Sequence, residues 1–246
     1  MIYKDLGIVD YKTAWDYQED LVKQNREIKQ SMVNGQLSMV KDIQTPNSQP
    51  QIINSKLQTT NYLLFCEHPA VYTLGKSGSM KNVLLSEKEM EEKEIEFFKT
   101  NRGGDITFHG LQQVVGYPIL DLENFYTDIG RYLRELEEVI IKTIAEYGLK
   151  GERSKGETGV WIQPGVIGKE RKICAMGIRC SRWITMHGFA LNVNTDLSYF
   201  ENIIPCGIQN KQVTSIEKEL NQKISFEEVK AKLKKNFSLI FNVEFI

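Results

Sequence analysis

The stretch Lys172-Ile173-Cys174-Ala175-Met176-Gly177-Ile178-Arg179 is the first of two long apolar runs that lie close together in the second half of the sequence. The other extends from Ile184 to Val193, and a shorter one covers residues 159–162. All three are rich in residues that favour strands, and glycine, serine and asparagine separate them. This pattern predicts one block of neighbouring strands.

Four further strands are predicted nearer the N-terminus. They cover residues 3–9, 62–66, 71–74 and 113–120, and the turn Glu67-His68-Pro69 separates the second from the third. Each is short and rich in apolar, β-branched or aromatic residues. The predicted sheet therefore draws on both halves of the chain.

Three helices complete the expected architecture. Asp10 can cap one that ends near Lys29, Asp128 begins a second that ends at Gly148, and a capping box at Ser225 begins the last. Strands that occur in groups, with a few helices between them, predict an α/β (α+β) fold in which helices pack outside a mixed sheet.

The composition is that of a soluble globular domain. With 246 residues, of which 41% are hydrophobic and 26% charged, the chain is long enough for one sizeable core. A single catalytic domain over residues 1–246 is therefore expected. Residues 31–60 are rich in Asn, Gln, Ser and Lys, contain Pro46 and Pro50, and show no sustained periodicity, which predicts a polar surface insertion.

The charge balance narrows the possible partners. Thirty-one basic and 32 acidic residues give a formal net charge of -1, so neither nucleic acid nor a membrane surface is expected as a partner. No stretch of 18 apolar residues occurs, and the first residues lack the pattern of a targeting segment. A cytoplasmic protein with reduced cysteines is the expectation.

One of the four cysteines has the surroundings of a nucleophile. Cys206 lies in Ile203-Ile204-Pro205-Cys206-Gly207-Ile208, where proline restricts the backbone before the thiol and glycine leaves the sulfur accessible. Cys66, Cys174 and Cys180 instead lie in apolar runs, which is typical of buried cysteines that act as small hydrophobic residues.

A cysteine nucleophile needs a group that keeps it ionised, because an unperturbed thiol of pKa ~8.5 is largely protonated at pH 7. Lys172 is one candidate, since it begins an apolar run, although a solvated lysine beside Lys169 and Arg171 is the commoner reading. His187 could serve instead as the base of a Cys-His pair. Sequence spacing does not decide between them.

The segment Arg102-Gly103-Gly104-Asp105-Ile106-Thr107-Phe108-His109 is a candidate binding loop, because adjacent glycines permit close approach of a ligand to the backbone. The simpler interpretation is a hairpin turn followed by a satisfied histidine. Cys66-Glu67-His68 has no second ligand pair at zinc spacing, and nucleotide-binding glycine motifs are missing, so neither metal nor cofactor is expected.

Taken together, these segments resemble the octanoyl transferases of lipoate biosynthesis, also called lipoyl(octanoyl) transferases or lipoate-protein ligase B. The resemblance covers the chain from Asn61 to about Thr214. The motifs that carry it are residues 67–75, 102–109, 159–161, 172–177, 187–194 and Pro205-Cys206-Gly207.

The resemblance implies transfer of an octanoyl group from octanoyl-acyl carrier protein to a lysine of lipoyl domains, without nucleotide. The acceptors implied are the lipoyl domains of 2-oxoacid dehydrogenases and the glycine cleavage H protein. Cys206 would carry the acyl group as a thioester, and Lys172 would tune that thiol. The substrate-lining positions implied are Arg102, Gly103, Gly104, Asp105, Ile106, Thr107, Phe108, His109, Ala175, Met176, Gly177, Gly188, Phe189 and Ala190.

The family shares its fold with the catalytic domains of biotin and lipoate protein ligases, in agreement with the mixed sheet predicted above. Val71, Leu74, Met176 and Phe189 are the expected walls of an apolar acyl tunnel. One departure concerns the loop after the binding segment, where the family usually has His-Gly-Pro-Gly-Gln and this chain has His109-Gly110-Leu111-Gln112-Gln113. The rigidity of that loop is left open by the sequence.

Two other functions stay in competition at this point. An ATP-dependent lipoate-protein ligase of the same fold would adenylate free lipoate, and a non-catalytic module would bind carrier proteins without transferring acyl groups. Basic residues exceed acidic ones between Lys150 and Arg182, which would suit an acidic carrier protein.

Overall fold

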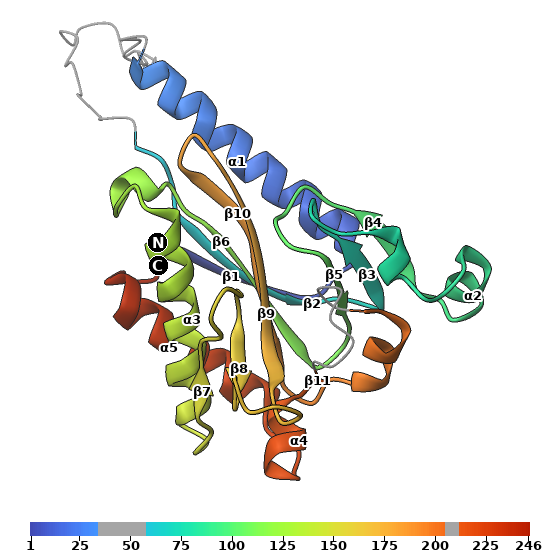
Figure 1. Ribbon diagram of the computed structural model, residues 1–246. Coiled ribbons are helices and arrows are strands. Elements are labelled where there is room, and N and C mark those ends of the chain that lie inside the picture. The colour runs from blue at the N-terminus through green and yellow to red at the C-terminus, as the bar shows by residue number, and fades with distance from the viewer. Residues whose placement is uncertain (34–57, 205–211) are drawn as a thin grey trace, which may run out of the picture.

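The computed structural model describes residues 1–33, 58–204 and 212–246 (Figure 1). The helices are α1 (Tyr11–Val33), α2 (Glu87–Glu92), α3 (Ile129–Ala145), α4 (Ile216–Leu220) and α5 (Phe226–Phe241). The strands are β1 (Ile2–Ile8), β2 (Tyr62–Glu67), β3 (Val71–Leu74), β4 (Glu96–Lys99), β5 (Ile106–His109), β6 (Gln113–Ile119), β7 (Gly151–Glu152), β8 (Val160–Ile162), β9 (Arg171–Ser181), β10 (Ile184–Asn192) and β11 (Gln212–Val213).

The main sheet is mixed, as the sequence predicted. Its strands follow the order β1-β2-β6-β10-β9-β8-β7, and β11 pairs with β9 outside this path. The pairs β1/β2 and β11/β9 are parallel, whereas β2/β6, β6/β10, β10/β9, β9/β8 and β8/β7 are antiparallel. The strand at residues 71–74 belongs to a separate sheet of order β4-β3-β5, which the sequence analysis did not separate from the first.

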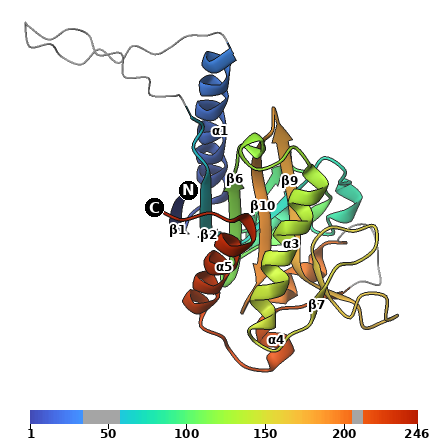
Figure 2. The same ribbon diagram turned by 90° about the vertical axis from the view of Figure 1, so that its left-hand side faces the viewer.

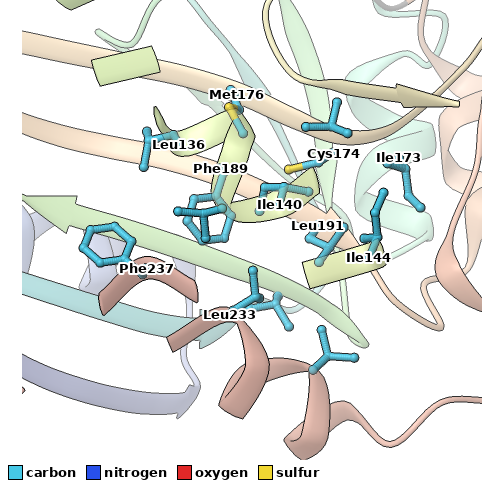
Figure 3. Packing of buried hydrophobic residues seen from close by; sticks show 14 of the residues in the cluster. Leu136, Ile140, Ile144, Ile173, Cys174, Met176, Phe189, Leu191, Leu233 and Phe237 are labelled. Atoms are coloured by element: carbon cyan, nitrogen blue, oxygen red, sulfur yellow. The ribbon is translucent and has the colours of Figure 1, made fainter. Parts of the chain in front are cut away.

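Helices cover both faces of the main sheet (Figure 2). On one face α1 buries Ala14, Leu21 and Val22. On the other, α3 and α5 pack against the sheet and each other. Figure 3 shows this second core, where Met176 and Phe189 of the sheet lie among α3 residues. The predicted outer helices are therefore confirmed.

The helix boundaries follow their caps. Asp10 accepts a hydrogen bond from the Thr13 amide (2.8 Å), and Asp128 caps α3 as predicted. Ser225 accepts a hydrogen bond from the Glu228 amide (3.3 Å), as a capping residue should. The Glu228 carboxylate instead forms an ion pair with Lys232 (2.8 Å), so the second half of the predicted capping box is not made.

The predicted insertion at residues 31–60 is only partly described. Helix α1 continues to Val33, beyond the end predicted near Lys29, and residues 34–57 lie outside the described residues. Thr59 is buried and donates to Asp121 (2.9 Å), so the end of this segment is anchored beside the sheet. Among the described helices, none combines the length and apolar character needed to cross a membrane.

Candidate active site

A cavity of about 850 Å³ lies beside β6, β9 and β10 and is also lined by the segment that contains β5. Its lining combines Val115 and Ala190, from the core beneath α1, with Met176 and Phe189, from the core beneath α3 and α5. The predicted residues that line it are Arg102, Gly104, Asp105, Ile106, Thr107, His109, Lys172, Ala175, Met176, Gly177, Gly188, Phe189 and Ala190.

Two predicted binding residues lie outside the lining. Phe108 points into a third core, where its ring stacks on Tyr199 with centroids 4.5 Å apart. It does so because successive strand residues face opposite ways, and its neighbour Thr107 takes the cavity side. Gly103 instead donates its amide to the Ile178 carbonyl (2.9 Å). The expected tunnel walls Val71 and Leu74 also lie outside the lining.

Lys172 lies at the partly exposed end of the cavity, near the start of β9. Its Nζ lies 4.6 Å from the centre of the Trp161 ring, a cation–π contact with the neighbouring strand β8. On its other side Val213 of β11 is in register with Lys172. Cys206, the predicted nucleophile, lies outside the described residues.

A pair of glycines brings the binding loop onto the sheet. Gly177 of β9 and Gly188 of β10 are directly paired. A Cβ at Gly177 would lie 2.7 Å from the Gly103 carbonyl oxygen, and one at Gly188 would lie 2.1 Å from the Gly116 carbonyl oxygen. The missing side chains therefore let two backbone segments approach β9 and β10 closely.

Replacement of Gly188 should damage both packing and site. We expect Gly188→Ala to lower the free energy of unfolding by about 3 kcal/mol, because the clash is with backbone that cannot move cheaply. The matched control is Gly103→Ala, whose Cβ would make an ordinary 3.5 Å contact. Urea unfolding of both variants measures the difference, and equal midpoints would contradict this account of the glycine pair.

Arg102 is a buried cation that holds the loop to the smaller sheet. It is 8% exposed, and its guanidinium donates to the Thr73 carbonyl (2.6 Å), the Thr73 hydroxyl (2.9 Å) and the Gly103 carbonyl (3.0 Å). These bonds fix the position of residues 102–104 against β3. A positive charge is thereby kept at the cavity wall.

His109 is held neutral in a defined tautomer. Gln113 donates from Nε2 to the Phe108 carbonyl (3.2 Å) and to Asn192 Oδ1 (2.8 Å), so its Oε1 is an acceptor. His109 therefore donates from Nδ1 to Gln113 (2.8 Å), and its Nε2 accepts from the Thr73 hydroxyl (3.3 Å). Burial lowers the pKa of His109 to about 3.

His187 lines the other end of the same cavity. It pairs with Ile178, six residues further along β9 than Lys172, which corresponds to about 20 Å along a strand. Lys172 and His187 therefore lie at opposite ends, and only one of them can activate a given thiol. Burial lowers the pKa of His187 to about 3, which makes it a weak base.

Residues 110–112, which differ from the usual family motif, still form a hydrogen-bonded turn between β5 and β6. Gln112 has a φ of 60°, at the position where the resembling family usually has glycine. Its amide donates to Glu67 (2.6 Å), its side-chain oxygen accepts from Asn194 (2.7 Å), and its carbonyl accepts from Thr195 (2.9 Å). These bonds offset the left-handed backbone and leave Leu111 exposed.

Several cavity residues were missed by the sequence analysis. The polar residues Gln113 and Asn192 were detectable, because each lies at the end of an apolar strand, at the start of β6 and at the end of β10. The remaining ones, which carry no local signal, are Tyr11, Val115, Tyr117, Thr158, Phe200 and Val213.

The other cysteines match their predicted structural role in part. Cys66 and Cys174 are buried and free, and burial raises the pKa of both thiols. Cys180 is free and half-buried, and burial raises its pKa as well. Among residues 1–33, 58–204 and 212–246, no group of three His, Cys, Asp or Glu side chains is arranged to hold a metal ion.

The fold is that of lipoate-protein ligases. A solved structure of an archaeal bipartite lipoate protein ligase from Thermoplasma acidophilum is similar, with a TM-score of 0.65 and 16% identity, over 100% of this chain and 85% of that chain. At this identity the likeness concerns the fold alone.

Sequence comparison defines the family. The model of the lipoyl protein ligase A/B catalytic domain matches residues 10–238, so the chain belongs to this family. An octanoyltransferase of Christiangramia forsetii is 56% identical over 98% of this chain and 95% of the relative. An octanoyltransferase of Flavobacterium johnsoniae is 54% identical over 99% of this chain and 97% of the relative.

Proposed function

We propose that this chain transfers an octanoyl group from acyl carrier protein to a lysine of lipoyl domains, through a thioester on Cys206. The observation that carries the proposal is the identity above 50%, over nearly the whole chain, with relatives named octanoyltransferase. The apolar side chains in the cavity lining support it, because burial of each methylene contributes about 0.8 kcal/mol to binding.

The first half-reaction loads the enzyme. The Cys206 thiolate attacks the carbonyl carbon of the carrier thioester, and a new C–S bond forms as the tetrahedral intermediate appears. When the intermediate collapses, the bond to the carrier sulfur breaks and the octanoyl group remains on Cys206. The departing carrier thiolate takes a proton from the Lys172 ammonium, which becomes a neutral amine.

The second half-reaction returns that proton. The ε-amine of the acceptor lysine attacks the octanoyl thioester, a C–N bond forms, and the C–S bond to Cys206 breaks. The attacking nitrogen loses a proton to the neutral amine of Lys172, and the thiolate and ammonium are restored. Because a thioester is already activated, the cycle consumes no nucleotide.

Lys172 is the better partner for this chemistry than His187. It lies at the partly exposed end of the cavity, where a carrier arm and an acceptor lysine can enter, and Val213 beside it follows Cys206 by only seven residues. The Trp161 ring favours an ammonium at that place. His187 is buried at the opposite end.

The partners we propose are octanoyl-acyl carrier protein as donor and, as acceptors, lipoyl domains of 2-oxoacid dehydrogenases and the glycine cleavage H protein. Arg153, Lys155 and Lys169 are exposed on the two loops that flank β8, Lys150 is exposed just before β7, and these basic residues would suit acidic partner surfaces. A cytoplasmic location, where Cys206 would stay reduced, is part of the same proposal.

The test is intact-protein mass spectrometry after incubation with octanoyl-acyl carrier protein. We expect one octanoyl adduct in the wild type, removed by a lipoyl domain and missing from Cys206→Ser. Dependence on ATP and free lipoate would instead support a ligase. Binding of carrier protein without any adduct would support a non-catalytic module, and either result would overturn octanoyl transfer.

A further inference from the structure

The loop between β8 and β9 holds two apolar side chains in solvent. Ile167 is 97% exposed, and its neighbour Val166 is 45% exposed. A single exposed apolar residue needs no explanation, but two adjacent ones at the tip of a loop form a small apolar patch. Such a patch near a candidate active site is a candidate contact for another protein.

The backbone of this loop presents the two side chains in a defined turn. The Val166 amide donates to the Gln163 carbonyl (3.3 Å), and the Lys169 amide donates to the Val166 carbonyl (2.9 Å). Gly165 and Gly168, on either side of the apolar pair, have φ values of 78° and 76°, which glycine adopts at low cost. The exposed pair is therefore held by a hydrogen-bonded turn.

The base of the loop places it beside the entrance of the cavity. The Arg171 guanidinium donates to the Gln163 side-chain oxygen (2.9 Å) and to the Lys169 carbonyl (2.7 Å), which ties the two ends of the loop together. Lys172, a partly exposed residue of the cavity lining, follows directly. The five residues of chain between Ile167 and Lys172 allow at most about 18 Å between them. A protein that contacts the tip therefore lies within reach of the cavity.

Two lysines of the loops that flank β8 have no partner of opposite charge within the described residues. Lys169 follows the apolar tip, Lys155 belongs to the loop before β8, and both are exposed. No described carboxylate forms an ion pair with either of them, whereas the neighbouring Arg153 pairs with Glu138 (2.8 Å). An apolar centre with positive charges at its rim is complementary to a protein surface that carries carboxylates around an apolar hollow.

We propose that residues 163–170 are the docking element for the acidic acyl carrier protein that delivers the octanoyl group. Ile167 enters an apolar hollow of the carrier, and Lys169 and Lys155 face its carboxylates. The inference rests on the proposed octanoyl transfer, and it names the surface that the protein part of the donor contacts. Burial of one isoleucine side chain contributes about tenfold to a hundredfold to affinity, and the charges mainly raise the rate of encounter.

The experiment compares two octanoyl donors that differ in their protein part, octanoyl-acyl carrier protein and octanoyl-pantetheine. Loading of the enzyme is followed as the adduct mass of the intact protein. We expect Ile167→Ser to raise the carrier concentration at half-maximal loading rate about tenfold and to leave loading from octanoyl-pantetheine unchanged. Fluorescence anisotropy of labelled carrier protein without an acyl group should show the same loss of affinity, about tenfold.

A charge variant tests the rim of the same surface. Lys169→Glu should weaken carrier binding several-fold at low ionic strength, and the loss should shrink as salt is added because exposed charges are screened. Ile167 and Lys169 are both exposed, so neither variant should alter the free energy of unfolding, which urea unfolding measures. A loss of carrier binding that does not depend on salt would contradict the role of this lysine.

The matched control is Leu239→Ser, at a 66% exposed leucine of α5 outside both loops and the cavity lining, which should leave loading from both donors unaltered. Normal carrier loading and binding in Ile167→Ser would overturn the inference and leave octanoyl transfer standing. Equal slowing with both donors would also overturn it, because the residue would then act on the site itself. Slowing confined to release of the octanoyl group to a lipoyl domain would make the acceptor the occupant and overturn the assignment to the carrier. No adduct from either donor in the wild type would instead refute octanoyl transfer.

Discussion

Lys172→Met should slow octanoyl transfer by about 100-fold to 1000-fold at pH 7, the range expected for loss of a positioned acid–base group. Methionine keeps most of the stem that packs near Trp161 but removes the ammonium. The same variant should slow alkylation of Cys206 by iodoacetamide more than tenfold, because a thiol of ordinary pKa, ~8.5, is only a few per cent thiolate at pH 7.

A matched variant separates the two roles of this lysine. Lys172→Arg retains a positive charge but cannot release its proton at neutral pH, so alkylation should stay fast while transfer remains slow. The alkylation site is readable by peptide mass, and the raised pKa of Cys66, Cys174 and Cys180 keeps these thiols less reactive. An unaltered pH profile of alkylation in Lys172→Met would show that another group, such as His187, activates the sulfur.

The fold was predictable wherever one local pattern decided an element. The apolar runs of residues 172–179 and 184–193 predict β9 and β10, and Asp10 and Asp128 mark the starts of α1 and α3. The division into two sheets was not predictable. It depends on the parallel pairing of β3 with β4, a contact between segments that carry no mutual sequence signal.

The candidate site was likewise predictable only in part. The residues of the 102–109, 175–177 and 188–190 segments come together because Gly177 and Gly188 are in register, and register follows from long-range pairing. Local sequence indicated which residues could matter, whereas the opposite placement of Lys172 and His187 follows only from the strand geometry. The hydrogen bond that holds His187 Nε2 likewise comes from Asn101, which is itself held by Glu19, and neither residue lies in a distinguishing motif.

The second large effect is a loss of stability in mild acid. The chain has three histidines, and His68, His109 and His187 are all buried. Burial lowers the pKa of His68 to about 4 and those of His109 and His187 to about 3. Each histidine has a pKa near ~6.5 in the unfolded chain, so below that pH the unfolded state binds more protons.

Stability should therefore be full above about pH 6.5 and fall steadily until the folded pKa values near 4 and 3 are reached. At pH 5 each histidine contributes a loss of about 2 kcal/mol in the free energy of unfolding, together about 6 kcal/mol, comparable with the total stability of many domains.

Urea unfolding at constant ionic strength between pH 7.5 and 5 measures how this free energy falls with pH. His68→Gln, which cannot titrate, should reduce the slope by about a third because each buried histidine contributes similarly. A midpoint that is independent of pH over this window would mean that protonated imidazoles are accommodated in the folded protein, contrary to the effect of burial on their pKa values.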